Sequence, residues 1–185
     1  MRSQATNMPS HTPEFENEDH LQRWLETQFE SAGWKAIREV NPHFSDYRAD
    51  LIVHHDDWGW IGIECKYLSS TRNGRKAAEA LEQIISQYRG RSYIGNEIIL
   101  WVFCPYFYKE EPGASFQTLR ELFCYFGIGV INLYRSDLKI NFSHSNKDAK
   151  ILVKSFGEYD DDREFGDPSV VHRSVESKLG RLQNR

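Results

Sequence analysis

The chain has 185 residues, of which 39% are hydrophobic, and a net charge of −4 at pH 7. This length predicts one domain with a sizeable core and argues against two compact domains. The first thirteen residues lack the apolar run of a signal peptide, and the longest apolar run, IILWVFCPYF, has ten residues, too few to span a bilayer. We therefore expect a soluble protein with no membrane partner.

The cysteines and the charged residues indicate the cellular environment of the protein and its possible partners. Cys65, Cys104 and Cys124 are widely separated, which favours a reducing, cytoplasmic environment over a disulfide framework or a zinc site. Residues 158–167 carry six acids and one arginine, so this run alone accounts for the acidity of the chain. Residues 66–91 carry six basic residues against two acids, which is either a modest footprint for nucleic acid or a solvated surface.

The N-terminal part is expected to be a disordered segment followed by a helix and a strand. Residues 1–13 are polar with two prolines, which predicts disorder. Apolar residues recur at helical spacing over residues 16–32, and Gly33 is typical of the residue that ends a helix. Residues 34–40 predict a strand. Glu18 falls on the apolar face of the helix, where a charged side chain is unusual and suggests a functional role. The alternative is a capping acid in the first turn of the helix.

Residues 47–67, YRADLIVHHDDWGWIGIECKY, predict a β-hairpin. Both halves are rich in β-branched and aromatic residues, and the intervening Asp-Asp-Trp-Gly is turn chemistry. Side chains alternate along a strand, so Glu64 and Lys66 share one face and Cys65 takes the other. A turn near residue 57 or 58 places Asp50 opposite Glu64 or Lys66, on their face.

Two carboxylates and an ammonium gathered at a sheet surface suit phosphodiester hydrolysis. Mg²⁺ prefers oxygen ligands and is commonly held by one or two carboxylates, with water and substrate phosphate completing its shell. A lysine beside the metal would orient the attacking water or balance the charge that develops on the phosphate. The alternative is a surface hairpin that carries an ordinary Glu and Lys.

The motif Arg48-Ala49-Asp50, followed after thirteen residues by Glu64-Cys65-Lys66, resembles that of the PD-(D/E)XK nuclease superfamily. This superfamily includes restriction endonucleases, Holliday-junction resolvases and recombination nucleases; alanine stands here where its name has proline. The resemblance covers residues 16–104 and implies a restriction-endonuclease-like α/β fold, an αβββαβ core with a central mixed sheet flanked by helices. It implies that Asp50 and Glu64 ligate Mg²⁺, with Mn²⁺ expected to substitute. The Cys65 carbonyl and Glu18 would assist.

After the hairpin, a loop at residues 68–75 and a helix at residues 75–89 are expected. Arg48, Arg72, Arg75 and Lys76 are the basic candidates for contacting DNA. Some branches of the superfamily carry a Gln-x-x-x-Tyr signature on this helix. Here Gln83 to Tyr88 is one residue too long and Gln87 adjoins Tyr88, so the likeness is partial, and Gln87 is taken as the candidate contact. Candidates of less weight are His54, which could line the cleft, and Trp58 and Trp60, which either stack on a base or pack on neighbours.

Beyond this helix, the sequence predicts a strand from Glu97, a helix at residues 115–126, and strands from Gly129 and Leu138. Residues 149–156 fit either a helix or a strand. We therefore expect a nuclease-like domain at residues 14–157, an acidic linker at 158–168, and a basic tail or helix at 169–185.

Together these features predict a Mg²⁺-dependent deoxyribonuclease, expected to act as an endonuclease, with Asp50, Glu64 and Lys66 as the catalytic residues. One alternative is a resolvase of branched DNA that acts as a homodimer. Another is a non-catalytic DNA-binding protein on a nuclease-like core.

Overall fold

The computed structural model describes residues 13–42, 46–68, 73–108, 114–133, 137–142, 150–156 and 166–184. Its elements, in chain order, are α1 (Glu18–Ser31), β1 (Lys35–Val40), β2 (Ala49–His55), β3 (Gly59–Leu68), α2 (Asn73–Glu82), the π-helix η1 (Gln83–Tyr88), β4 (Ser92–Tyr93), β5 (Asn96–Glu97), β6 (Leu100–Phe107), α3 (Ala114–Tyr125), β7 (Gly129–Asn132), β8 (Asp137–Asn141), β9 (Lys150–Ser155) and α4 (Pro168–Gln183). Apart from the small β4–β5 hairpin, the first part follows the predicted order α-β-β-β-α-β.

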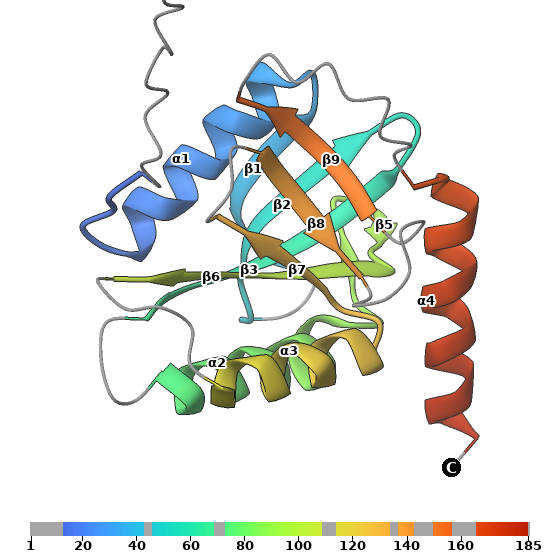
Figure 1. Ribbon diagram of the computed structural model, residues 1–185. Helices are drawn as coiled ribbons and strands as arrows, with labels where there is room; N and C mark the ends of the chain where they lie inside the picture. Colours follow the sequence, from blue (N-terminus) through green and yellow to red (C-terminus); the bar gives the residue numbers. More distant parts are fainter. Residues whose placement is uncertain are drawn as a thin grey trace, which may run out of the picture.

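A seven-stranded mixed sheet organises the fold, with the strand order β1-β2-β3-β6-β7-β8-β9. The strands β3, β6 and β7 run parallel to one another, and the pairs at either side of them are antiparallel. Helices flank this sheet, with α1 on one side and α2 and α3 on the other (Figure 1). The predicted α/β class with a central mixed sheet between helices is therefore confirmed.

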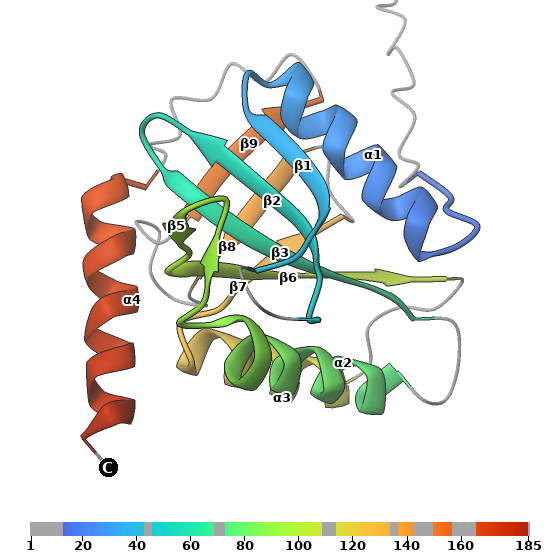
Figure 2. The same ribbon diagram turned by 180° about the vertical axis from the view of Figure 1, so that it is seen from behind.

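The sheet curls, so that its last strands approach the first helix (Figures 1 and 2). Lys154 Nζ, on β9, lies 2.6 Å from Ser31 Oγ at the end of α1. Trp24 of α1 stacks on Phe156, just after β9, with 6.2 Å between the ring centroids. Residues 150–155 thus form a strand, one of the two alternatives that the sequence allowed.

Two apolar clusters fill the two sides of the sheet. One lies under α1 and α4 and includes Leu25, Ile63 and Val175. The other lies under α2, η1 and α3 and includes Trp101 and Phe103 of β6. Because side chains alternate along β3, the odd-numbered residues from Ile61 enter the first cluster and the even-numbered ones face the second side, as the sequence predicted.

The β2–β3 hairpin has the register that the alternation required. Leu51 pairs with Ile63 and Val53 with Ile61, so the residue numbers of each pair sum to 114. Asp50 and Glu64 each lie one position further from the turn and are therefore opposite one another. The hairpin therefore places Asp50, near the start of β2, opposite Glu64 in the middle of β3.

Several expectations differ from the structure or lie outside it. The helix expected at residues 75–89 is an α-helix that continues as a π-helix, and the strand expected from Glu97 begins at Leu100, after the β4–β5 hairpin. Residues 1–12, Arg72 and most of the acidic segment lie outside the described residues. The C-terminal residues form helix α4, whose Val171 and Val175 are fully buried. None of the helices within the described ranges has the length and apolar character needed to cross a membrane.

Candidate functional site

Asp50 and Glu64 lie opposite one another on neighbouring strands of the sheet, one from each strand of the hairpin. The carboxylate of Asp50 accepts a hydrogen bond of 2.7 Å from the backbone N–H of Cys65. Cys65 itself points into the apolar cluster under α1 and is fully buried. The backbone of Cys65 thus holds Asp50 beside Glu64, while no described contact tests the predicted role of the Cys65 carbonyl.

Glu64 is a buried acid, with a side chain only 1% exposed. Its Oε1 contacts Lys66 Nζ, and its Oε2 is buried without a hydrogen-bond partner among the described residues. Burial, followed by the neighbouring charge of Asp50, raises the pKa of Glu64 to about 8, although Lys66 opposes the shift. Burial also raises the pKa of Asp50, against Lys66 and the Cys65 N–H. The two carboxyl groups therefore share a site that disfavours two negative charges.

Among the described residues, Lys66 is the cation that contacts Glu64, and its charge also opposes the rise in the pKa of Asp50. Burial lowers its pKa, but Glu64, Glu18 and Asp50 more than offset this effect, so the pKa of Lys66 is raised. Lys66 Nζ lies 3.8 Å from Glu18 Oε1. The ammonium group thus stays protonated between an acid of β3 and an acid of α1.

Glu18 reaches the site from the first turn of α1. The helix begins there because Asn17 caps it, accepting a hydrogen bond from the N–H of His20. Glu18 Oε2 accepts a 3.2 Å hydrogen bond from the backbone N–H of Tyr67. Glu18 is therefore part of the cluster, as the sequence suggested, but its contacts are with Lys66 and the β3 backbone.

Tyr88 is a residue of this site whose contribution the sequence did not reveal. It is buried, and its hydroxyl donates a 3.2 Å hydrogen bond to the carbonyl of Arg48, two residues before Asp50. Burial and then the charges of Glu64 and Asp50 raise the pKa of Tyr88. The available signals were its place on the apolar stripe of the helix, which by itself indicates only a core residue, and the partial likeness to the Gln-x-x-x-Tyr signature.

A π-helical turn brings Tyr88 into this position. In η1 the N–H of Arg89 bonds to the carbonyl of Ile84, five residues back, at 3.0 Å. Residues five apart therefore lie one turn apart, as Gln83 and Tyr88 do. The Gln83-to-Tyr88 spacing, which is one residue too long for an α-helical turn, is the spacing of one π turn. Gln83 Oε1 is buried and has no hydrogen-bond partner among the described residues.

Two of the predicted DNA-contacting residues are exposed arginines, and each forms an ion pair with a glutamate. Arg48 is exposed and pairs with Glu39 at 3.3 Å. Arg75 is exposed and pairs with Glu79 at 2.8 Å along α2.

Two further candidates of this kind belong to the second helix. Lys76 Nζ donates a 2.9 Å hydrogen bond to the carbonyl of Tyr67, the residue after Lys66. Gln87 is half-buried, and no described contact joins it to the carboxylates.

The aromatic candidates of the hairpin pack on neighbours. Trp58 is 8% exposed and belongs to the core under α1 and α4. The rings of His54 and Trp60 lie against each other with 4.7 Å between centroids. Packing, the second of the two alternatives for these tryptophans, is therefore the one observed.

A hard divalent cation fits the residues of this site. Asp50 and Glu64 offer oxygen donors, and Glu64 Oε2 is a buried carboxylate oxygen that lacks a partner. A cation there would offset the burial of negative charge and the repulsion from Asp50, which together raise the pKa of Glu64. Within the described ranges, no group of three or more His, Cys, Asp or Glu side chains is close enough to bind a metal ion.

Comparisons with known proteins add little to this geometry. No family model matches the chain, and no curated protein matches it. A solved structure that matches is SPO1766, a protein of unknown function from Silicibacter pomeroyi, with 13% sequence identity over 92% of this chain and 91% of that chain and a TM-score of 0.37. We infer neither fold nor function from a likeness at this level.

Proposed function

We propose that the protein is a Mg²⁺-dependent nuclease that hydrolyses phosphodiester bonds in DNA. The observation that supports this most directly is the pairing of Asp50 with a buried Glu64 whose second oxygen has no partner, beside the ammonium of Lys66. Such a site is poorly suited to a purely structural role, because a buried carboxyl group without full hydrogen bonding costs stability.

In this proposal Asp50 and Glu64 hold the metal ion, and Mn²⁺ substitutes for Mg²⁺. The ion, when bound, would lower the pKa of a coordinated water and neutralise charge on the phosphate. The Cys65 N–H fixes the orientation of Asp50, and Tyr88 fixes the backbone before it.

Lys66 has the charge and the position to stabilise a phosphate. Its ammonium remains protonated near neutral pH because three acids raise its pKa. Glu18 holds it from the side of α1. A fixed positive charge at this point stabilises the negative charge that develops on a reacting phosphate.

DNA as the substrate is supported by the basic side chains around the carboxylates. Arg48 lies two residues before Asp50, and Lys76 contacts the strand that carries Lys66.

All three cysteines are free and buried, which agrees with the reducing, cytoplasmic setting expected from the sequence.

A cleavage panel tests the proposal. Linear, circular, single-stranded and four-way-junction DNA are incubated with the purified protein in Mg²⁺, in Mn²⁺ and in EDTA, beside Asp50→Ala and Lys66→Ala. We expect metal-stimulated cleavage by the wild type and none by either variant. Full activity in a folded Asp50→Ala or Lys66→Ala protein contradicts the assignment.

The same panel separates the alternatives. DNA binding without cleavage under any metal condition would favour a non-catalytic DNA-binding protein. Cleavage restricted to the junction, together with a dimer in gel filtration, would favour a resolvase.

A further inference from the structure

Three acids occupy one row across the first three strands of the sheet. In the β1–β2 ladder Arg38 pairs with Leu51 and Val40 with Ala49, so Glu39 stands opposite Asp50. Glu64 lies opposite Asp50 on the other side. In regular strands the Glu39 side chain would lie beside Asp50 on the same face, where like charges repel.

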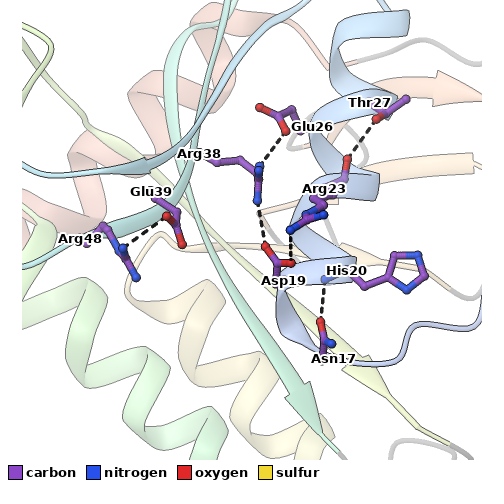
Figure 3. Close-up of polar contacts among 9 residues, drawn as sticks. All are labelled: Asn17, Asp19, His20, Arg23, Glu26, Thr27, Arg38, Glu39 and Arg48. Atoms are coloured by element: carbon purple, nitrogen blue, oxygen red, sulfur yellow. Dashed lines mark hydrogen bonds and ion pairs between the residues drawn. The ribbon is translucent and has the colours of Figure 1, made fainter.

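The backbone of Glu39 departs from the strand at this point. Its φ is +55°, in the left-handed region that residues other than glycine rarely adopt. The Glu39–Asp50 pair is missing from the ladder, while the pairs before and after it are formed. The Glu39 carboxylate meets Arg48 at 3.3 Å, whereas the preceding Arg38 bonds to acids of α1 (Figure 3).

Arg48 combines a fixed backbone with an accessible guanidinium group. The Tyr88 hydroxyl holds its carbonyl, and Arg91 lies over the ring of the preceding Tyr47, 5.1 Å from its centroid. The side chains of Arg48 and Glu39 are 57% and 48% exposed. An exposed pair of this kind is weak, and a phosphate, which accepts two parallel hydrogen bonds from arginine, is a strong competitor for it.

We infer that Glu39 is an internal competitor for DNA: it occupies the Arg48 guanidinium in the free protein and gives way to a backbone phosphate of the strand that enters beside Asp50. This inference rests on the proposed function, since it requires DNA at this site. The inference gives a role to the left-handed backbone of Glu39. This conformation directs the Glu39 carboxylate toward Arg48 and away from Asp50 and Glu64. The Arg48 guanidinium group is then free to bind DNA only when a phosphate has replaced Glu39.

The test measures the binding of a short fluorescein-labelled DNA duplex by fluorescence anisotropy, in EDTA and over a series of salt concentrations. Glu39→Gln removes the competing charge, so we expect binding to tighten by up to about fivefold at low salt. Glu39→Asn also removes the charge, and asparagine adopts a positive φ more readily than glutamate or glutamine does, so we expect this variant to fold. Asp46→Asn, which removes an exposed acid from the same segment as Arg48, is the matched control and should show a smaller effect.

A double-mutant cycle decides whether the effect passes through Arg48. Arg48→Ala should weaken binding and lower the slope of log affinity against log salt by about one. In that background Glu39→Gln should tighten binding no more than Asp46→Asn does. Equal effects of the two substitutions in the wild-type background, or a Glu39→Gln gain that persists without Arg48, would overturn the inference while leaving the proposed function intact. A wild-type protein that neither binds nor cleaves DNA overturns both.

Discussion

The backbone N–H of Cys65 donates a 2.7 Å hydrogen bond to the side chain of Asp50 across the two strands of the hairpin. This bond places the Asp50 carboxylate beside Glu64, because Glu64 is the residue that precedes Cys65. The side chain of Cys65 is locked in the core on the other face of the sheet. The position of Asp50 is therefore set by the core and not only by its own strand.

Asp50→Asn separates the charge of Asp50 from its hydrogen bond. The amide oxygen can still accept from the Cys65 N–H, so we expect the free energy of unfolding to change by less than about 1 kcal/mol. The substitution removes the negative charge and replaces one carboxylate oxygen with an amide nitrogen, which does not ligate Mg²⁺. Mg²⁺-dependent cleavage should therefore fall by at least about 100-fold. Urea unfolding and initial cleavage rates measure the two effects, and unchanged cleavage would show that Asp50 is not a ligand.

The pKa of Glu64 predicts that the metal-free protein loses stability as the pH rises. Below the unfolded pKa of 4.5 the carboxyl is protonated in both states; between there and the folded pKa of about 8 only the unfolded chain ionises. Ionisation then favours unfolding, by on the order of 3 to 5 kcal/mol over this range. Urea unfolding in EDTA at several pH values should show the loss, and Glu64→Gln should remove most of it.

The same pKa predicts that Mg²⁺ binding releases protons near pH 7. Glu64 is then mostly protonated, and a carboxyl group must lose its proton to ligate a metal. Isothermal titration calorimetry in two buffers of different ionisation enthalpy should give different apparent heats. The heats should converge near pH 9, and identical heats in both buffers at pH 7 would speak against Glu64 as a ligand.

Gly62 is required by the close approach of Trp101 to strand β3. A Cβ added at Gly62 would lie 2.4 Å from the Trp101 ring, on the face that carries Glu64. Gly62→Ala should therefore destabilise the protein by about 1 to 3 kcal/mol, or more if the ring cannot move. Gly74→Ala is the control, because a Cβ there meets open space; thermal unfolding of both variants should show a loss for Gly62→Ala alone.

Ile94 occupies a strained position in the turn of the β4–β5 hairpin. Its φ is +51° and that of Gly95 is +78°, and a β-branched residue is disfavoured in this region. Asn-Gly is the preferred pair for a two-residue turn with two positive φ values, and Ile94 is 47% exposed, so little burial is lost on replacement. Ile94→Asn should raise the free energy of unfolding by about 1 kcal/mol in urea unfolding, whereas Ile94→Val should not.

The sequence by itself determined the hairpin and which residues share its faces. Alternation has a period of two, so a turn near residue 57 leaves only one way to bury Ile61, Ile63 and Cys65 together. That arrangement places Asp50, Glu64 and Lys66 on the opposite face before any coordinates are known. Apart from the β4–β5 hairpin, the order of elements through β6 follows from equally local patterns. The structure confirms the fold class, whereas the nuclease activity stays a prediction.

Only the tertiary structure decided how the rest of the chain meets this hairpin. The π turn that places Tyr88 against the Arg48 carbonyl depends on the packing of η1 over the sheet, and no local pattern distinguishes it from an α-helical turn. The positive φ of Glu39 and its contact with Arg48 are likewise invisible in a strand-like sequence, because the residues that surround Glu39 come from a neighbouring strand and the segment before it. Contacts between segments distant in sequence are stabilised by burial and charge that exist only in the folded protein.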